Sequence, residues 1–210
     1  MKVKVCGMRN IDNIAELCNL SIDYIGMIFY SKSPRYVETI PSINIQLLKD
    51  ITTSANVQRI GVFVNEDIQY VLDKAKEYQL DYAQLHGNEN PEYCNEIREE
   101  IPVIKAFSIS SSNDFINIEQ YSDCCEYFLF DTKTESYGGS GKKFDWSMLD
   151  KYTGIIPFFL SGGISLTDVE RIKAMTHPLL YGIDVNSRFE KEPGIKDIEL
   201  LTQFLNKLKS

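Results

Sequence analysis

Hydrophobic and polar residues alternate along this chain in a regular succession of short apolar runs and longer amphipathic stretches. The runs are rich in β-branched and aromatic residues, as β-strands are. In the stretches between them, apolar residues recur three, four and seven positions apart, which predicts helices with one buried face. Eight runs predict strands: residues 2–6, 24–29, 58–64, 82–87, 102–107, 127–131, 157–162 and 179–184.

The helical pattern is clear in three of the connecting stretches. Apolar stripes lie at Ile11, Ile14, Ala15 and Cys18, at Ile68, Val71, Leu72 and Ala75, and at Leu201, Phe204, Leu205 and Leu208. The stretches after residues 102–107 and 127–131 show only weak helical patterns. Eight strand–helix units in 210 residues predict an α/β fold, a single (β/α)8 barrel domain spanning residues 1–210.

An open doubly wound sheet would show the same alternation. The barrel is favoured because the count reaches eight with no residues left over, and because no dinucleotide-binding fingerprint follows any strand. The glycine-rich segment Gly138–Lys143 lacks the P-loop frame, since Ser136 occupies the first glycine position and Lys143 the hydroxyl position. The polar residues 132–146 instead predict a flexible cover over the barrel mouth.

Charge and composition narrow the range of partners. The hydrophobic share of 43% and the charged share of 25% are ordinary for a globular protein, and the formal net charge is −8. This acidity disfavours nucleic acid and anionic membranes as main partners. Because no apolar run is long enough to cross a bilayer and no signal-peptide pattern is present, we expect a cytoplasmic protein without a membrane partner.

The cysteine pattern indicates free thiols. The odd number and irregular spacing of Cys6, Cys18, Cys94, Cys124 and Cys125 disfavour a disulfide framework. There is no CxxC pair and the only histidines are His86 and His177, so the sequence predicts no structural zinc site. We interpret the other four, none of which has an obvious partner, as packing or incidental residues.

Two ionisable residues stand where predicted strands end. Cys6 is followed by Gly7, which permits a sharp turn and leaves room for a ligand, and then by Asn10 as a helix cap. Asp131 ends an apolar run, where a carboxyl group must reach solvent or be specially stabilised. The C-terminal strand ends of a barrel carry its catalytic residues. Both are therefore catalytic candidates, with a packed cysteine and a chain-turning aspartate as the alternatives.

Hydrogen-bond donors follow the last two predicted strands. Gly162 and Gly163 open a turn whose backbone N–H groups suit an anion, and Asn186 and Ser187 follow the eighth strand. The corresponding loops of barrels often bind phosphate, so we expect a small phosphorylated substrate.

Side chains after the second and fourth strands are candidates for the rest of the pocket. Arg35 suits a carboxylate or an aromatic ring. Gln84 and His86 point the same way on a strand and either could line the pocket. A surface arginine and a packed histidine are the alternatives.

With these residues in place, the chain resembles the phosphoribosylanthranilate isomerases of tryptophan biosynthesis over essentially its whole length. The resemblance rests on KVCGM, FYSKSPRYV, RIGVFVN, QLHG, LFDT, GGSGKKFDW, LSGGI and GIDVNSRFE, in this order. It implies an Amadori rearrangement of N-(5-phosphoribosyl)anthranilate to 1-(2-carboxyphenylamino)-1-deoxyribulose 5-phosphate, with no cofactor. It also implies Cys6 as general base and Asp131 as general acid.

The same resemblance assigns the remaining contacts. Arg35 would touch the anthranilate moiety, His86 and Asp184 would line the pocket, and the phosphate would be held by Gly162, Gly163, Asn186 and Ser187. Where the family usually has a Ser-Gly pair after the eighth strand, this chain has Asn-Ser-Arg. Arg188 could add charge to the phosphate site or point away from it. A monomer and a homodimer are both consistent with the sequence.

Two other functions are weighed against this one. An aminoaldose isomerase of histidine biosynthesis resembles the chain in fold and phosphate site, but has an aspartate where Cys6 stands. A non-catalytic phosphate-binding barrel would have no need for both Cys6 and Asp131.

Overall fold

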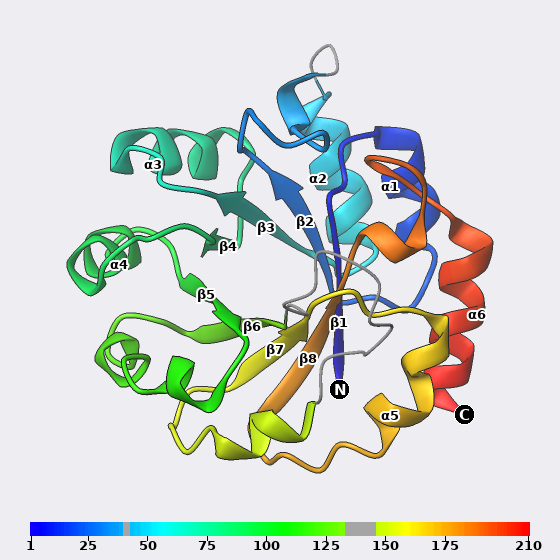
Figure 1. The fold of residues 1–210 in the computed structure, drawn as a ribbon. Coiled ribbons are helices and arrows are strands. Elements are labelled where there is room, and N and C mark those ends of the chain that lie inside the picture. Colours follow the sequence, from blue (N-terminus) through cyan, green and yellow to red (C-terminus); the bar gives the residue numbers. More distant parts are fainter. Residues whose placement is uncertain (40–42, 133–145) are drawn as a thin grey trace.

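Eight parallel strands close into a barrel (Figure 1). The structure is a computed structural model, and it describes residues 1–39, 43–132 and 146–210. Each strand pairs with the next, and β8 pairs with β1 so that Lys4 aligns with Asp184. The (β/α)8 barrel expected from the sequence is confirmed. The strands are β1 (Lys2–Cys6), β2 (Tyr24–Ile28), β3 (Gln58–Phe63), β4 (Tyr82–Leu85), β5 (Val103–Ile109), β6 (Tyr127–Thr132), β7 (Phe158–Ser161) and β8 (Leu180–Val185).

Helices surround the barrel on its outside (Figure 1). Those described are α1 (Ile11–Cys18), α2 (Ile45–Ser54), α3 (Ile68–Glu77), α4 (Pro91–Arg98), α5 (Val169–Lys173) and α6 (Ile198–Lys209). The apolar stripes predicted for α1, α3 and α6 are thus helical. After β5 and β6 the described residues form only 3-10 turns, at Ser112–Phe115, Glu119–Tyr121 and Trp146–Lys151. This agrees with the weak helical patterns there.

The connection between β8 and α6 contains a small ribbon. It consists of two short antiparallel strands, β9 (Glu190–Glu192) and β10 (Ile195–Lys196). The predicted cover over the barrel mouth, residues 132–146, lies outside the described residues except for its first and last residues.

Asparagine side chains cap several of the helices, as the sequence of α1 predicts. The Asn10 side chain accepts a hydrogen bond from the backbone N–H of Asn13 at 2.9 Å, and Asn44 and Asn90 cap α2 and α4 in the same way. Each such cap stabilises a helix by about 1 kcal/mol. The Asn10 cap fixes where the chain leaves the turn at Gly7, directly after Cys6.

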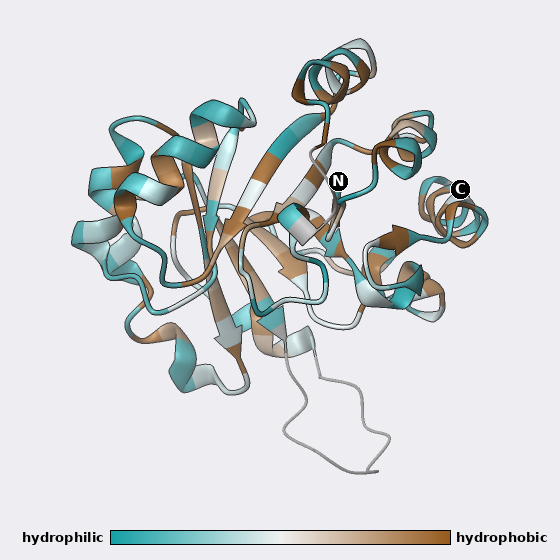
Figure 2. Ribbon diagram, turned by 90° about the horizontal axis from the view of Figure 1, so that it is seen from above, coloured by the Kyte–Doolittle hydropathy of each residue, from teal (hydrophilic) through white to brown (hydrophobic). Residues whose placement is uncertain are grey.

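The inner and outer surfaces of the barrel carry different residues. Alternate residues of a strand point to opposite faces, so Val3 and Val5 of β1 face the helices and Lys4 faces the interior. In Figure 2 the hydrophobic colour gathers on the strands and on the helix faces turned toward them.

No helix among the described residues is long and apolar enough to span a membrane.

Packed side chains fill the interior of the barrel. Tyr24 contacts Tyr82 and Phe159 edge to face, with ring centroids 6.1 and 5.6 Å apart. Tyr127 stacks on Tyr181 at 4.4 Å, and the Tyr24 and Tyr181 hydroxyls are 2.8 Å apart. Because these residues lie in the first half of their strands, they close the N-terminal end of the barrel. The catalytic candidates lie at the opposite, C-terminal end of the strands.

Candidate active site

A buried charged group lies inside the barrel where β1 meets β8. Lys4 and Cys6 share the inward face of β1 because residues two apart in a strand point the same way. The Lys4 ammonium lies 3.0 Å from Asp184 Oδ2, and both side chains are almost completely buried. The same ammonium is within hydrogen-bonding reach of the Cys6 sulfur. Cys6 is therefore a buried thiol beside a cation.

Burial and this cation act on the thiol in opposite directions. Burial raises the pKa of Cys6, while Lys4 and Lys196 lower it without cancelling the effect. Burial also raises the pKa of Asp184 against the influence of Lys4. For Lys4, burial alone would lower the pKa, but Asp184 and Cys6 together raise it. The charged amine is thus retained in the barrel, where it stabilises a thiolate whenever one forms.

Two glycines provide the room that this arrangement needs. A Cβ atom at Gly26, on the neighbouring strand, would lie 2.8 Å from Cys6 Sγ. A Cβ atom at Gly7 would lie 2.7 Å from both Arg35 Cδ and Asn186 Oδ1, and Gly7 has a φ of +82° that side chains disfavour. The turn predicted at Gly7 is confirmed.

We expect Gly26→Ala to lower kcat/KM by about 100-fold, because the added methyl group would displace the Cys6 sulfur from the barrel mouth. Misplacing a reacting group by about 1 Å costs that much in comparable cases. Steady-state kinetics would measure the effect, and the thermal unfolding midpoint would show that the barrel still forms. Unchanged kcat/KM in a folded Gly26→Ala protein would contradict the importance of this sulfur position.

The predicted acid, Asp131, meets His86 across the barrel mouth. His86 Nε2 lies 3.6 Å from Asp131 Oδ2, and Gln84 Nε2 lies 2.9 Å from His86 Nδ1. Since an amide NH₂ only donates, Nδ1 accepts, and a neutral ring carries its proton on Nε2, toward Asp131. Asp184 interacts electrostatically with both His86 and Asp131, and also with Cys6. The candidates from β1, β4, β6 and β8 thus belong to one site.

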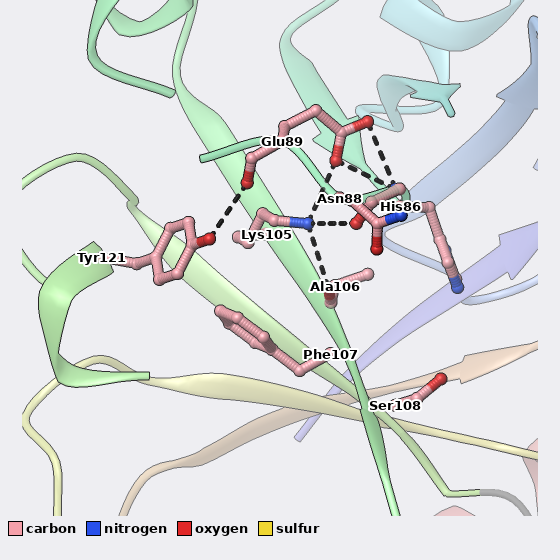
Figure 3. Close-up of a pocket in the computed structure, with 9 residues that line it drawn as sticks. His86, Asn88, Glu89, Lys105, Ala106, Phe107, Ser108 and Tyr121 are labelled. Carbon is pink, nitrogen blue, oxygen red and sulfur yellow. Dashed lines mark hydrogen bonds and ion pairs between the residues drawn. The ribbon is translucent and has the colours of Figure 1, made fainter. Parts of the chain in front are cut away.

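A cavity of about 350 Å³ opens beside His86, between the ends of β4 and β5 (Figure 3). Its wall is held by a buried ion pair, Lys105 Nζ to Glu89 Oε2 at 3.1 Å. Lys105 also donates to the carbonyl of Gly87 at 2.8 Å. Glu89 accepts from the backbone N–H groups of Gly87 and Asn65 at 2.9 and 2.8 Å. These bonds fix the loop that follows His86 and so hold the imidazole in place.

Arg35 is bound by an acidic residue of the chain itself. Its Nε and Nη2 donate to the Glu190 carboxylate, at 2.5 Å for Nη2 to Oε2. Lys196 Nζ completes the cluster by donating to Glu190 Oε1 at 2.6 Å and to Asn186 Oδ1 at 2.8 Å. The hydrogen bonds from Arg35 and Lys196 outweigh burial and hold the pKa of Glu190 below its usual value. Among the described residues, the Glu190 carboxylate takes only the Nε and Nη2 groups of Arg35 and not Nη1.

The predicted phosphate-binding residues lie at the ends of β7 and β8. Gly162 and Gly163 have φ values of 105° and 66°, a turn that only glycines adopt readily. The segment after them begins as a 3-10 turn at Leu166–Asp168 and not as an α-helix. The groups available to an anion at this point are therefore the backbone N–H groups of the glycine turn. Asn186 accepts from Lys196 through its oxygen, which leaves its NH₂ group to donate.

Several polar residues of the site were not predicted from the sequence. These residues have buried side chains that form ion pairs: Lys4, Lys105, Glu89, Glu190 and Lys196. Ser187, which was predicted, is exposed, and so is Arg188. One signal was available for Lys4, which lies two residues before Cys6 in a strand and must share its face. The other pairs form between residues whose proximity depends on the closed barrel.

Known proteins match this chain over nearly its whole length. A family model described as N-(5'phosphoribosyl)anthranilate (PRA) isomerase matches residues 3–207. The N-(5'-phosphoribosyl)anthranilate isomerase of Parabacteroides distasonis is 47% identical over 209 residues, which are 99% of this chain and 93% of that protein. The chain belongs to the N-(5'-phosphoribosyl)anthranilate isomerase family.

Solved structures of phosphoribosylanthranilate isomerases support the same assignment. The enzyme from Thermotoga maritima superimposes with a TM-score of 0.82 at 36% identity, covering 100% of this chain and 98% of that one. Another, solved in complex with reduced 1-(o-carboxyphenylamino)-1-deoxyribulose 5-phosphate, has a TM-score of 0.79 at 32% identity, with coverage of 100% and 98%. The family and the isomerase function predicted from the sequence are confirmed, and the histidine-biosynthesis alternative is not supported.

Proposed function

We propose that this chain rearranges N-(5'-phosphoribosyl)anthranilate to 1-(o-carboxyphenylamino)-1-deoxyribulose 5-phosphate with Cys6 as general base and Asp131 as general acid. One observation carries the proposal. Two pairs of side chains lie at the barrel mouth: Cys6 with the cation Lys4, and Asp131 with His86. Asp184 interacts electrostatically with both pairs and so connects them into one group. The chain's own acid and base supply the proton transfers, so no cofactor is needed.

The reaction needs a proton to be delivered at one point and removed at another. Protonated Asp131 donates to the furanose ring oxygen, the C1–O bond breaks, and the anthranilate nitrogen lone pair forms an iminium bond to C1. Cys6 thiolate then removes the C2 proton and gives an enaminol. Protonation of C1 by the Cys6 thiol and return of the O2 proton to Asp131 yield the ketone and restore both groups. Each such transfer contributes about 10²–10⁴-fold to the rate.

The neighbouring residues bind and orient the substrate in this proposal. Asp184 Oδ1 is buried and has no hydrogen-bond partner among the described residues, so it offers an acceptor to a sugar hydroxyl. The free edge of the Arg35 guanidinium suits the anthranilate carboxylate. The phosphate would take backbone N–H groups of Gly162 and Gly163 with the side chains of Asn186 and Ser187. Arg188 is exposed and is assigned no role.

The assembly proposed for the enzyme is simple. We propose that residues 1–210 form one catalytic unit, since all residues invoked above belong to one barrel. A monomer and a homodimer are both compatible with this unit. For Thermotoga maritima, mutually generated monomers of a dimeric phosphoribosylanthranilate isomerase have been solved. We propose a cytoplasmic enzyme, consistent with the small phosphorylated substrate and reduced thiols. Light scattering of the purified chain would distinguish the two assemblies.

A direct assay tests the reaction. The protein is mixed with freshly generated phosphoribosylanthranilate, and the decay of the substrate's fluorescence is followed beside an enzyme-free control. We expect decay much faster than the spontaneous loss, together with formation of the deoxyribulose phosphate product. Decay at the spontaneous rate would refute the proposed function and favour the non-catalytic phosphate-binding barrel.

The pH dependence of Lys4→Met tests the role of the cation. The Lys4 ammonium lowers the pKa of Cys6 against burial, which raises it. Removing the ammonium raises the pKa of Cys6 further and leaves less thiolate at neutral pH. We therefore expect Lys4→Met to have a lower kcat/KM at neutral pH, measured by steady-state kinetics over a pH series. Unchanged kcat/KM at neutral pH in a folded Lys4→Met protein would contradict the role of Lys4.

A further inference from the structure

Three of the five cysteines lie together outside the active site. Cys94 belongs to α4, while Cys124 and Cys125 lie in the turn that leads into β6. Their sulfur atoms are all within 4.8 Å of one another, and all three residues are buried. They are packed in the core, as interpreted from the sequence, and they also lie against one another. Residues about 30 positions apart had to meet through the packing of α4 beside β5 and β6.

A local turn brings the two neighbouring cysteines to the same side. Successive residues of an extended strand would point in opposite directions. Here the Cys124 N–H and the Cys124 thiol both donate to the carbonyl of Tyr121, at 3.2 and 3.3 Å. This turn leaves Cys124 Sγ 3.9 Å from Cys125 Sγ. Both sulfurs then face Cys94.

The spacing of the sulfurs suits a metal ion. With a metal–thiolate bond of about 2.3 Å, sulfurs in a planar three-coordinate site are about 4.0 Å apart, and those of a tetrahedral site about 3.8 Å. The Cys124–Cys125 separation of 3.9 Å lies between these values. A disulfide would require the same sulfurs to approach to about 2.05 Å. A cation needs much less movement than a disulfide.

Two cations lie near the three thiols. The Lys105 ammonium interacts electrostatically with Cys94, and the Arg98 guanidinium with Cys124. In the parts of the chain that the structure describes, no histidine or carboxylate joins the three thiols, and Glu89 is held by Lys105. Soft sulfur ligands without oxygen donors select soft d¹⁰ cations such as Cu(I) over Mg²⁺ or Ca²⁺.

We propose that Cys94, Cys124 and Cys125 form a three-thiolate binding site for a soft d¹⁰ cation of the Cu(I) type. Each thiol that binds releases its proton to solvent, and no electron transfer takes place when the metal is supplied as Cu(I). Lys105 and Arg98 offset the negative charge of the complex. The site is separate from Cys6 and lies on the outer side of the barrel wall.

Titration of the full-length reduced protein tests the site. Cu(I) is supplied anaerobically from a bathocuproine buffer, and Cd²⁺ is used in a second series to report thiolate coordination by ultraviolet charge-transfer absorption. We expect one Cu(I) per chain to survive gel filtration and to raise the thermal unfolding midpoint, since a ligand of the native state stabilises it. Cys94→Ser and Cys125→Ser should each weaken binding by at least about tenfold. Cys18→Ser and Cys6→Ser are matched controls that should bind as the unmodified protein does.

Three results would overturn the proposal. The first is no binding beyond that of a variant lacking all three thiols. The second is binding that persists in Cys94→Ser or is lost in Cys6→Ser, because the metal would then lie elsewhere. The third is a purified protein in which two of these thiols are already joined in a disulfide, shown by thiol counting and mass. If Cys94→Ser fails to fold by circular dichroism, Cys125→Ala decides in its place.

Discussion

Cys6→Ser is expected to lower kcat by about 10²–10⁴-fold while leaving KM nearly unchanged. Serine keeps the size of the side chain and its hydrogen bond to Lys4, but an alcohol is far harder to ionise than a thiol, so the base that removes the C2 proton is lost. The measurement is steady-state kinetics with phosphoribosylanthranilate. Substrate contacts made by other residues stay in place, which is why the loss should appear in kcat.

The matched control for this substitution is Cys18→Ser. Cys18 lies at the end of α1, is half-buried, and belongs to no part of the site. It should retain the activity of the unmodified protein. Equal activity in Cys6→Ser and Cys18→Ser would return Cys6 to the role of a packed residue and remove the general base from the mechanism.

Asp131→Asn is expected to cause a comparable collapse of kcat, again about 10²–10⁴-fold. The amide has nearly the same shape as the carboxyl group, so its oxygen can stay beside His86 Nε2, which lies 3.6 Å from the carboxylate. An amide does not release a proton in this pH range, so ring opening loses its acid.

Asp73→Asn is the control for Asp131→Asn, because Asp73 is an exposed aspartate on α3 that interacts with Gln69. It should be fully active. A stable Asp131→Asn protein with full activity would show that another group protonates the ring oxygen, and His86, 3.6 Å from the carboxylate, would be the next residue to test.

Local sequence patterns were sufficient to predict the barrel and its main chemical groups. Strand runs and apolar stripes are set by neighbours within a few residues, so α1, α3 and all eight strands were predictable. Cys6 and Asp131 were found because each ends a strand, and the ends of parallel strands meet at one face of a barrel. Gly7 and the glycines after β7 could be recognised as turn residues because glycine adopts positive φ values more readily than other residues. Their φ values are positive in the structure.

Pairs that form only on barrel closure could not be predicted in this way. Lys4 and Asp184 are 180 residues apart, and their pairing depends on the register of β1 with β8. The sequence suggested that Arg35 is available to a ligand, whereas in the structure Glu190 already binds much of its guanidinium. The cluster of three cysteines was missed for a similar reason. The distances between their sulfur atoms depend on a turn at Tyr121 and on how α4 packs against the barrel.

The closure of β1 against β8 has a consequence for how the enzyme comes into being during translation. The thiol emerges near the start of synthesis, but Asp184, Glu190 and Lys196, which complete its surroundings, emerge near the end. Contacts so distant along the chain form late and slowly in folding. A growing polypeptide on the ribosome therefore carries Cys6 as an ordinary cysteine, and its catalytic character arises only when the last strand docks.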